Sequence, residues 1–392
     1  MKIIIHKGSH QIGGSITEIA TDSSRIVIDM GADLPNSKNA HQSKLIIDGV
    51  TAGSVRCDGV LITHYHGDHL GLFKEVLPGI PVYIGHIAKE VYLLLCERID
   101  KKNLKLVKKF QTFKALDKVQ FGDIVVTPLF IDHSAFDAYM FLIEAEGKKI
   151  LHTGDFRTHG VRGSKLIKML KCYVGQVDVL ITEGTLLIRA NEKAMTEYEL
   201  QQEAKKLMAQ HKYVFILCSS TNIDRIFSFI HAKPDGKPFI CDSYQKEVLE
   251  LIKKESSKHS DFYNYENVYS YAPNLDDLMN QRGFCMLIRS SDYFKPFLDR
   301  YKDDCLIIYS MWKGYLNGEA KNEKMVDFLA PYKYTYLHTS GHATTDAIKE
   351  VCDTVRPKNA VIPIHTENPD ALIDLCVGYS VKVLEDGDEY IA

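Results

Sequence analysis

Three histidines and one aspartate lie within six residues of the chain, directly after an apolar run. The segment reads Gly59-Val-Leu-Ile-Thr-His64-Tyr-His66-Gly-Asp68-His69. The apolar run predicts a strand, so His64 and His66 at its end point the same way and can bind one metal ion. Asp68 and His69 follow in the turn and can reach a second ion. Imidazole and carboxylate ligands suit Zn²⁺ best, with Mn²⁺ as the alternative.

The competing interpretation of this segment is a polar loop that happens to contain histidines. Imidazoles crowded at the end of one strand would repel one another on protonation unless they held a cation. We therefore prefer the metal site, and two zinc ions are the expected cofactor.

Short β-branched runs that end in turn residues dominate the chain from Lys2 to about Glu183, and these runs predict strands. Helical periodicity appears between some of them, at His86–Glu97 and Ser164–Leu170. From about 184 to 332 longer helical stretches alternate with strand runs, and residues 256–293 are polar and rich in tyrosine. The strand-rich style returns afterwards, starting with a strand at Tyr334–His338. The pattern indicates an α/β (α+β) chain in which one domain interrupts another.

The histidine motif resembles that of the metallo-β-lactamase superfamily, whose members carry H-x-H-x-D-H after a strand. The resemblance implies an αββα sandwich and two metal ions completed by later strand-end residues. Three later positions fit: His133, Asp155 and His365. Taken alone, either histidine would more often be a core or loop residue. By resemblance one ion is held by His64, His66 and His133, the other by Asp68, His69 and His365, with Asp155 bridging. Asp29 matches an early family aspartate that supports the metal loop.

The remaining motifs resemble those of the β-CASP nucleases, and of the RNase J family in particular. Glu183 in Thr-Glu-Gly-Thr185, the segment His338-Thr-Ser-Gly-His342, and His365 in Pro-Ile-His-Thr-Glu correspond to three family motifs. A histidine in the third is the pattern of family members that act on RNA. The resemblance implies a lactamase-type domain at 1–183 and 333–392 and an inserted β-CASP domain at 184–332. Members of this family usually carry a further C-terminal domain that helps assembly. A homo-oligomer is therefore a possible but undecided state of this protein.

The same motifs supply candidates for catalysis and for phosphate binding. Asp68, Glu183 and His342 are the catalytic candidates, since Glu183 beside His342 would fix its tautomer or share the general-acid role. The hydroxyl of Ser340, the backbone N–H of Gly341 and the imidazole of His342 could stabilise a phosphoryl transition state. The predicted phosphate-binding residues are Ser340, Gly341 and His342, together with Ser220, Asn222 and Arg225. The segment of the last three resembles a Ser-Asn…Arg stretch of the RNase J family that lies near the substrate phosphates. The alternatives are a solvated strand-end acid for Glu183, a small turn for residues 340–342, and a helix N-cap with surface neighbours for residues 220–225.

Composition narrows the class of protein further. The chain of 392 residues has 48 Lys and Arg against 51 Asp and Glu, which excludes a broadly basic, nucleic-acid-coating protein. Its nine cysteines include no C-x-x-C pair, and no run approaches the length of a membrane span, so we expect a cytoplasmic protein without a membrane partner.

The function predicted from the sequence is a dinuclear-zinc ribonuclease that hydrolyses RNA phosphodiester bonds in RNA processing or decay, as exonuclease, endonuclease or both. One alternative is a metal-dependent hydrolase of small molecules on the same fold. The other is a catalytically silent RNA-binding scaffold.

Overall fold

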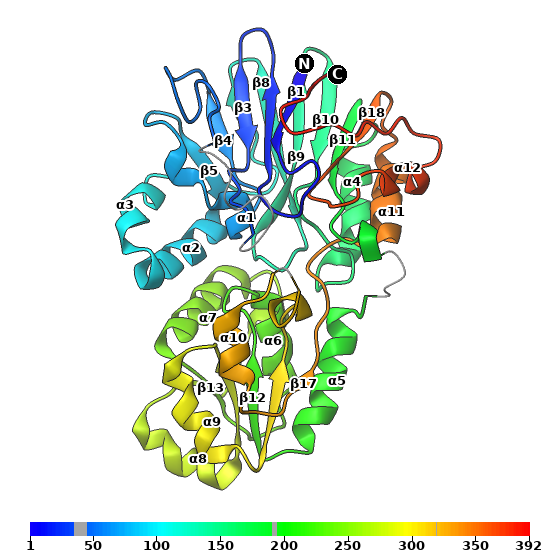
Figure 1. The fold of residues 1–392 in the computed structure, drawn as a ribbon. Helices are drawn as coiled ribbons and strands as arrows, with labels where there is room; N and C mark the ends of the chain where they lie inside the picture. The colour runs from blue at the N-terminus through cyan, green and yellow to red at the C-terminus, as the bar shows by residue number, and fades with distance from the viewer. Residues whose placement is uncertain (35–44, 190–193, 319) are drawn as a thin grey trace. The chain divides into compact units, whose positions relative to one another are not determined.

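The computed structural model describes residues 1–34, 45–189, 194–318 and 320–392. The chain forms two compact units, which Figure 1 shows as ribbons. Unit 1 consists of Met1–Lys193 and Gly341–Ala392, and unit 2 consists of Ala194–Ser340. Unit 1 is therefore assembled from both ends of the chain. Unit 2 begins ten residues and ends eight residues later than the inserted segment 184–332 predicted from the sequence, and that division into domains stays a prediction.

Unit 1 contains two mixed sheets. The first has seven strands in the order β19-β1-β2-β3-β4-β5-β6. They are β1 (Lys2–Lys7), β2 (Ile16–Ala20), β3 (Arg25–Ile28), β4 (Gly59–Leu61), β5 (Val82–Gly85), β6 (Gln111–Phe113) and β19 (Glu389–Ile391). Strands β3 to β6 run parallel, so their carboxyl ends share one edge of the sheet.

The second sheet has six strands in the order β18-β11-β10-β9-β8-β7. They are β7 (Val119–Phe121), β8 (Ile124–Ile131), β9 (Ala138–Ala145), β10 (Lys148–His152), β11 (Val179–Glu183) and β18 (Ala360–Ile364). The parallel trio β10, β11 and β18 ends in the segments that carry Asp155, Glu183 and His365. Three residues distant in sequence thereby reach the same edge.

The two sheets pack face to face through apolar side chains from both. Ile28 and Leu61 of the first sheet and Phe141 and Ile181 of the second belong to one buried cluster. Helices cover the outer faces: α2 packs beside β5 and β6, and α4, α11 and α12 cover the second sheet (Figure 1). The helices of unit 1 are α1 (Gly67–Leu70), α2 (His86–Ile99), α3 (Leu104–Val107), α4 (Leu166–Tyr173), α11 (Thr345–Val355) and α12 (Ala371–Leu375). This is the αββα order of layers expected from the sequence.

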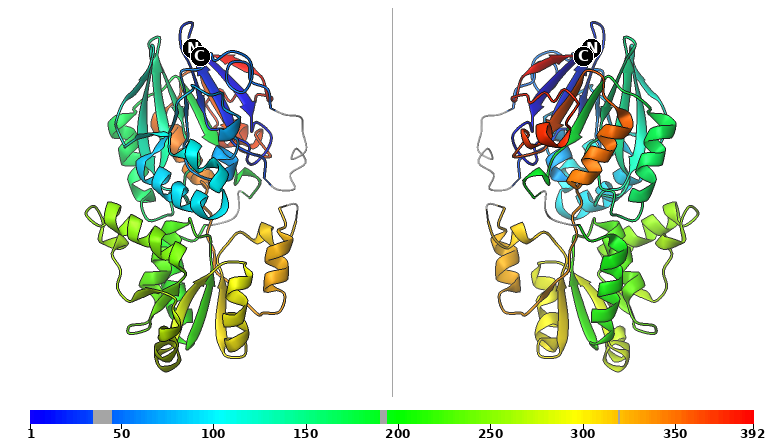
Figure 2. Two further views of the ribbon diagram at one scale, coloured as in Figure 1. Left: turned by 90° about the vertical axis from the view of Figure 1, so that its left-hand side faces the viewer. Right: turned by 90° about the vertical axis from the view of Figure 1, so that its right-hand side faces the viewer.

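Unit 2 is a doubly wound α/β unit around a six-stranded parallel sheet of order β14-β13-β15-β12-β16-β17. Its strands are β12 (Tyr213–Leu217), β13 (Phe239–Cys241), β14 (Val268–Ser270), β15 (Phe284–Ile288), β16 (Cys305–Tyr309) and β17 (Thr335–Tyr336). Helices flank both faces, with α5, α6 and α7 on one side and α8, α9 and α10 on the other (Figures 1 and 2). They are α5 (Glu197–Ala209), α6 (Ile223–Ala232), α7 (Ser243–Ser256), α8 (Asp276–Arg282), α9 (Lys295–Tyr301) and α10 (Glu323–Leu329).

Short 3₁₀ turns connect many of these elements. They are η1 (Phe73–Glu75), η2 (Lys101–Asn103), η3 (Gly163–Lys165), η4 (Leu187–Arg189), η5 (Asp261–Tyr263), η6 (Pro273–Leu275), η7 (Asp292–Phe294) and η8 (Lys313–Tyr315).

Two local predictions differ from the structure. The polar stretch 256–293 was expected to hold only loops and short helices, yet β15 within it is buried at the centre of the sheet of unit 2. The strand expected at Tyr334–His338 is the short β17, which pairs with β16 of unit 2. The segment after β11 packs with unit 1 as far as η4, since Leu187 of η4 is buried in the core of that unit.

No helix among the described residues is long and apolar enough to cross a membrane.

Candidate metal centre

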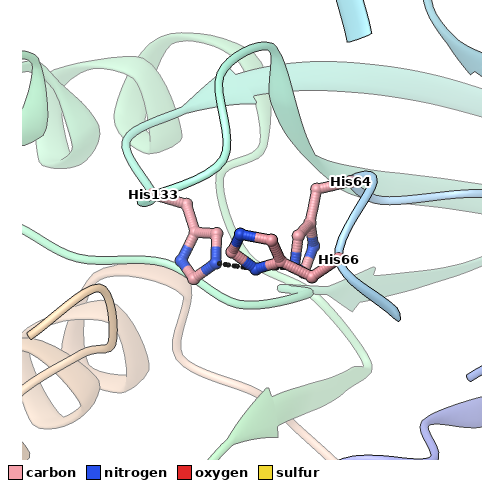
Figure 3. A group of neighbouring side chains, drawn as sticks. All are labelled: His64, His66 and His133. Carbon is pink, nitrogen blue, oxygen red and sulfur yellow. Dashed lines mark hydrogen bonds between the residues drawn. The ribbon is translucent and has the colours of Figure 1, made fainter. Parts of the chain in front are cut away.

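Three imidazoles converge where β4 and β8 end in unit 1. His66 Nδ1 lies 3.1 Å from His64 Nε2 and 3.2 Å from His133 Nε2. Figure 3 shows the three rings turned toward one another, His64 and His66 from the loop after β4 and His133 from the loop after β8. His64 and His133 are buried, whereas His66 is half-buried.

Partners on the far side of two rings fix which nitrogen faces inward. Thr63 Oγ1 donates to Asp29, so it accepts from His64 Nδ1 at 3.0 Å. His133 Nδ1 donates to the carbonyl of Gly341 at 2.7 Å. Both Nε2 atoms are therefore lone-pair acceptors, which is the ligand form of imidazole.

A second group of donors lies beside the first. His69 Nε2 is 3.1 Å from Asp155 Oδ2, and His365 Nε2 is 3.3 Å from Asp68 Oδ2. His69 Nδ1 donates to Asp29 Oδ2 at 2.8 Å, so its Nε2 also points into the group. Donor atoms of Asp68, His69 and His365 lie within 4.8 Å of one another, as do those of His64, His69 and Asp155. The structure thus brings all seven predicted ligand residues together.

The geometry of these donors fits a metal ion better than a hydrogen-bonded cluster. Tetrahedral nitrogen ligands 2.0–2.1 Å from zinc lie about 3.3 Å from one another, close to the 3.1 and 3.2 Å separations around His66. A proton on His66 Nδ1 could serve only one of its two acceptor neighbours. Buried Asp155 Oδ1 also has no hydrogen-bond partner. Cations at these positions would satisfy all of these atoms.

Unusual backbone geometry supports the centre at three places. Asp29 and His365 have positive φ values of 63° and 54°, a conformation that costs free energy in residues other than glycine. Each follows the last residue of a buried strand. Gly31 approaches the metal loop so closely that a Cβ atom there would lie 1.8 Å from the carbonyl oxygen of Asp68. The loop that carries Asp68 and His69 therefore needs glycine at this position.

Burial and charge set the protonation of the histidines. Burial lowers the pKa of His66 to about 4 and holds the pKa values of His64 and His133 well below the usual range, so all three are neutral. Burial opposes ionisation of His69, but Asp155 and Asp29 raise its pKa well above the usual range. The two carboxylates thus create a strong preference for positive charge at this imidazole, which suits a cation.

Glu183 and His342 form a pair next to the ligands. Glu183 is fully buried, and its Oε1 accepts from the backbone N–H groups of Phe156 at 2.8 Å and Ala343 at 3.3 Å. Its Oε2 lies 3.2 Å from His342 Nδ1, and Asp155 Oδ2 lies 3.5 Å from the same nitrogen. Burial opposes the charge on His342, but Glu183 and Asp155 raise its pKa to about 9. The pair can hold a proton beside the donor cluster.

Thr185 is a site residue to which the sequence reasoning gave no role. Its Oγ1 lies 2.9 Å from His365 Nδ1 and 3.2 Å from His342 Nδ1, so one hydroxyl orients both rings. The signal was its place two residues after Glu183 in the quoted Thr-Glu-Gly-Thr motif. Asp137 is a second such residue: it accepts from Ile87 N and Ala88 N at the start of α2 and so anchors the loop of His133.

The predicted phosphate-binding residues of unit 2 lie around the start of α6. Ser220 is half-buried, and Asn222 precedes α6 with a buried Oδ1 that has no hydrogen-bond partner. Arg225 is fully buried, and its guanidinium bonds Glu197 through Nε and Nη2, Ser310 Oγ through Nη1, and the Thr339 carbonyl through Nη2. In this conformation Arg225 therefore anchors unit 2 internally. Gly341 and His342 belong to unit 1, and Ser340 is the last residue of unit 2.

Comparison with known families gives the class of the protein. Residues 12–255 match the model of the metallo-beta-lactamase superfamily, and the chain belongs to that superfamily. Residues 332–379 match a model described as a Zn-dependent metallo-hydrolase RNA specificity domain. The superfamily, the fold and the metal-dependent hydrolase class predicted from the sequence are thereby confirmed.

Individual relatives show which members of the superfamily the chain resembles. The chain is 24% identical to Ribonuclease J of Helicobacter pylori strain 26695, over 94% of this chain and 56% of that protein. It is 28% identical to a probable RNase of Methanocaldococcus jannaschii, over 81% and 74%. The chain thus spans little more than half the length of the Helicobacter relative. The predicted resemblance to the RNase J family is confirmed.

A solved structure shares the whole fold. It is a protein of unknown function from Enterococcus faecalis V583, and it superposes with a TM-score of 0.79 at 19% sequence identity. The superposition covers 100% of this chain and 99% of that one.

Proposed function

We propose that this protein is a ribonuclease that hydrolyses RNA phosphodiester bonds, leaving 5′-phosphate and 3′-hydroxyl ends. The observation that carries the proposal is the convergence of two donor groups, around His66 and around Asp155, with the Glu183–His342 pair beside them. The match of residues 332–379 to an RNA specificity domain supports RNA as the substrate.

Two zinc ions are the proposed cofactor. His64, His66 and His133 would hold one, Asp68, His69 and His365 the other, and Asp155 both. The nitrogen-rich donors and their separations of about 3 Å favour zinc over magnesium or calcium, which prefer oxygen. Bound metal ions in such a site supply Lewis-acid stabilisation of phosphoryl charge and lower the pKa of water.

The protein's own residues would handle protons and orient the phosphate. His342, whose Nδ1 lies 3.2 Å from Glu183 Oε2, would hold a proton and deliver it to the leaving oxygen. Glu183 is held by the backbone N–H groups of residues 156 and 343, so it keeps His342 in place. The backbone N–H of Gly341 and the hydroxyl of Ser340 would bind phosphate oxygens.

In unit 2, a second phosphate contact is proposed at the start of α6. Helix N-termini favour anions, and the side-chain NH₂ group of Asn222 just before α6 can donate a hydrogen bond to a phosphate oxygen. The hydroxyl of Ser220 is the other proposed contact. Arg225 would support them through its ion pair with Glu197, at 2.7 Å, instead of touching the phosphate.

The protein is proposed to act in the cytoplasm. All nine cysteines are free thiols, eight of them at least half-buried, as expected of a chain that folds under reducing conditions.

The direct test is to offer the zinc-loaded protein labelled single-stranded RNA, the same sequence as DNA, and a chromogenic lactam or ester. We expect RNA cleavage that His66→Ala abolishes and His259→Ala leaves unchanged, because His259 is exposed and outside the donor groups. Turnover of the chromogenic compound alone would replace this function with small-molecule hydrolysis. Fewer than two metal equivalents together with no cleavage would favour the scaffold.

The mode of cleavage is tested separately with one RNA in two forms. Linear 5′-monophosphate RNA is degraded by either kind of nuclease, whereas a circular RNA of the same sequence is cleaved only by an endonuclease. Cleavage of the circle would exclude a purely exonucleolytic enzyme.

A further inference from the structure

A concentrated positive surface lies in unit 1, outside the metal centre. In residues 101–109, five of nine side chains are lysines and none is acidic, although the chain as a whole has a net charge of −3. We call this the basic surface, and its residues are Lys101, Lys102, Lys105, Lys108 and Lys109. It comprises η2, α3 and the two residues that follow α3.

These lysines are free to bind a ligand. All five are exposed, and in the part of the chain that the structure describes none has a carboxylate within 4.0 Å. The acid next to them in sequence, Asp100, accepts a hydrogen bond from Asn103 at 2.7 Å. Five unpaired charges this close together repel one another, so a polyanion that replaces their counterions is favoured.

The backbone beneath the basic surface is fixed. Val107 and Phe110 are buried, and Lys89 of α2 donates to the carbonyl groups of Lys108 at 3.1 Å and Phe110 at 2.7 Å. The lysines are therefore presented on a preformed support, and binding need not order a loop.

Helix α2 links the basic surface to the metal centre. Its first turn is bound by Asp137, four residues after the ligand His133, through hydrogen bonds of 2.7 and 2.9 Å from Ile87 N and Ala88 N. From there α2 runs for 14 residues toward η2 and α3 (Figure 1). At 1.5 Å per residue the helix is about 21 Å long, a span that a strand of several nucleotides can bridge.

We propose that the basic surface binds the phosphates of an RNA strand at a distance of several nucleotides from the scissile bond. This rests on the proposed function, because that function supplies RNA as the ligand. An anionic membrane is the weaker partner: α3 has only four residues, Val107 and Phe110 are buried, and Leu106 is the one large apolar side chain of α3 that is exposed, which is too little for an amphipathic membrane helix. Phosphate binding needs only the cations.

The test compares two triple variants of the full chain. Lys102→Gln/Lys105→Gln/Lys109→Gln removes three charges from the basic surface. Lys165→Gln/Lys168→Gln/Lys171→Gln removes three exposed charges at α4, on the opposite outer layer of the same unit. Binding of fluorescent 20-nucleotide and 4-nucleotide oligouridylates is measured in EDTA, which prevents metal-dependent cleavage, at several salt concentrations.

For the 20-nucleotide RNA we expect the first variant to bind about 10- to 100-fold more weakly at 0.1 M salt. The slope of log K against log salt should fall in magnitude by about 2, since each single-strand phosphate contact contributes about 0.7. The 4-nucleotide RNA should lose less affinity in the first variant than the 20-nucleotide RNA, because it cannot contact the centre and the basic surface at once. The second variant should match the unmodified protein.

Equal losses in both triple variants, or no loss in the first, would overturn the proposal. So would unchanged RNA binding together with lost binding to phosphatidylglycerol vesicles, which would assign the basic surface to a membrane. Because binding is measured without turnover, a protein that cleaves no RNA would refute the proposed function, while these titrations still decide the role of the lysines.

Discussion

Replacing Asp29 by Asn tests how the protein orients a metal ligand. The Asp29 carboxylate accepts from Thr63 N at 2.7 Å, from Thr63 Oγ1 at 2.9 Å and from His69 Nδ1 at 2.8 Å. An amide of the same shape keeps one acceptor oxygen but turns an NH₂ group toward another donor. If that group faces His69, the imidazole must move its proton to Nε2, the atom that faces Asp155.

The expected effect follows from this change of tautomer. Loss of a partner that orients a metal-bound histidine weakens metal binding by about 10- to 100-fold, or about 1.4–2.7 kcal/mol. The metal-free protein should also lose about 1–3 kcal/mol of stability, because a buried hydrogen-bonded carboxylate is altered. Asparagine tolerates the positive φ at this position, so the backbone should persist.

The assay is zinc competition against a chromophoric chelator, with urea unfolding in EDTA as the measure of stability. The matched control is Asp178→Asn, since Asp178 is buried in the same unit and accepts from Lys149 N at 2.8 Å, away from the ligands. Both variants should lose stability, and only Asp29→Asn should lose zinc affinity. Equal zinc affinity in the two variants would refute the argument that Asp29 acts through His69.

Three further outcomes can be checked with the same methods. His66→Ala should abolish RNA cleavage and remove one metal equivalent while leaving the unfolding midpoint in EDTA nearly unchanged; metal analysis that still finds two equivalents would contradict its role as a ligand. Glu197→Gln should cost about 3–5 kcal/mol in urea unfolding, because it leaves the buried Arg225 guanidinium without a counter-charge, yet zinc content should not change. Gly31→Ala should weaken zinc binding at least tenfold, since its Cβ would collide with the Asp68 carbonyl; unaltered zinc titration would show that the loop can yield.

The ligand residues could be found from sequence because each follows an apolar strand run. Parallel strands such as β11 and β18 bring the residues after them to one edge, so Thr185 Oγ1 lies 2.9 Å from His365 Nδ1 although 180 residues separate the two. The layer order was predictable for the same reason, since the alternation of strand and helix patterns fixes which faces are apolar.

Other features required the structure because the local sequence is misleading. The run Phe284–Ile288 lies in a polar stretch, and only its position between β12 and β13 shows that it is a central strand. Arg225 follows Ser220 and Asn222 in a segment that suggests phosphate binding, but its partners come from residues 197, 310 and 339, which no local pattern connects. Thr185 was visible only as part of a motif, since its two contacts lie far along the chain.

Strand β18, which completes the second sheet of unit 1, follows the whole of unit 2 in the sequence. The completion of the metal centre therefore depends on the order of synthesis. At about 5–20 residues per second, His365 leaves the ribosome roughly 10–50 s after His133. Unit 2 is contiguous and can fold during that interval. The histidines after β4 emerge early and lack the ligand residue His365 until β18 has been synthesised. We therefore expect a stalled chain lacking β18 to present an incomplete, weakly zinc-binding half-site, so that the proposed hydrolytic activity arises only after His365 has emerged.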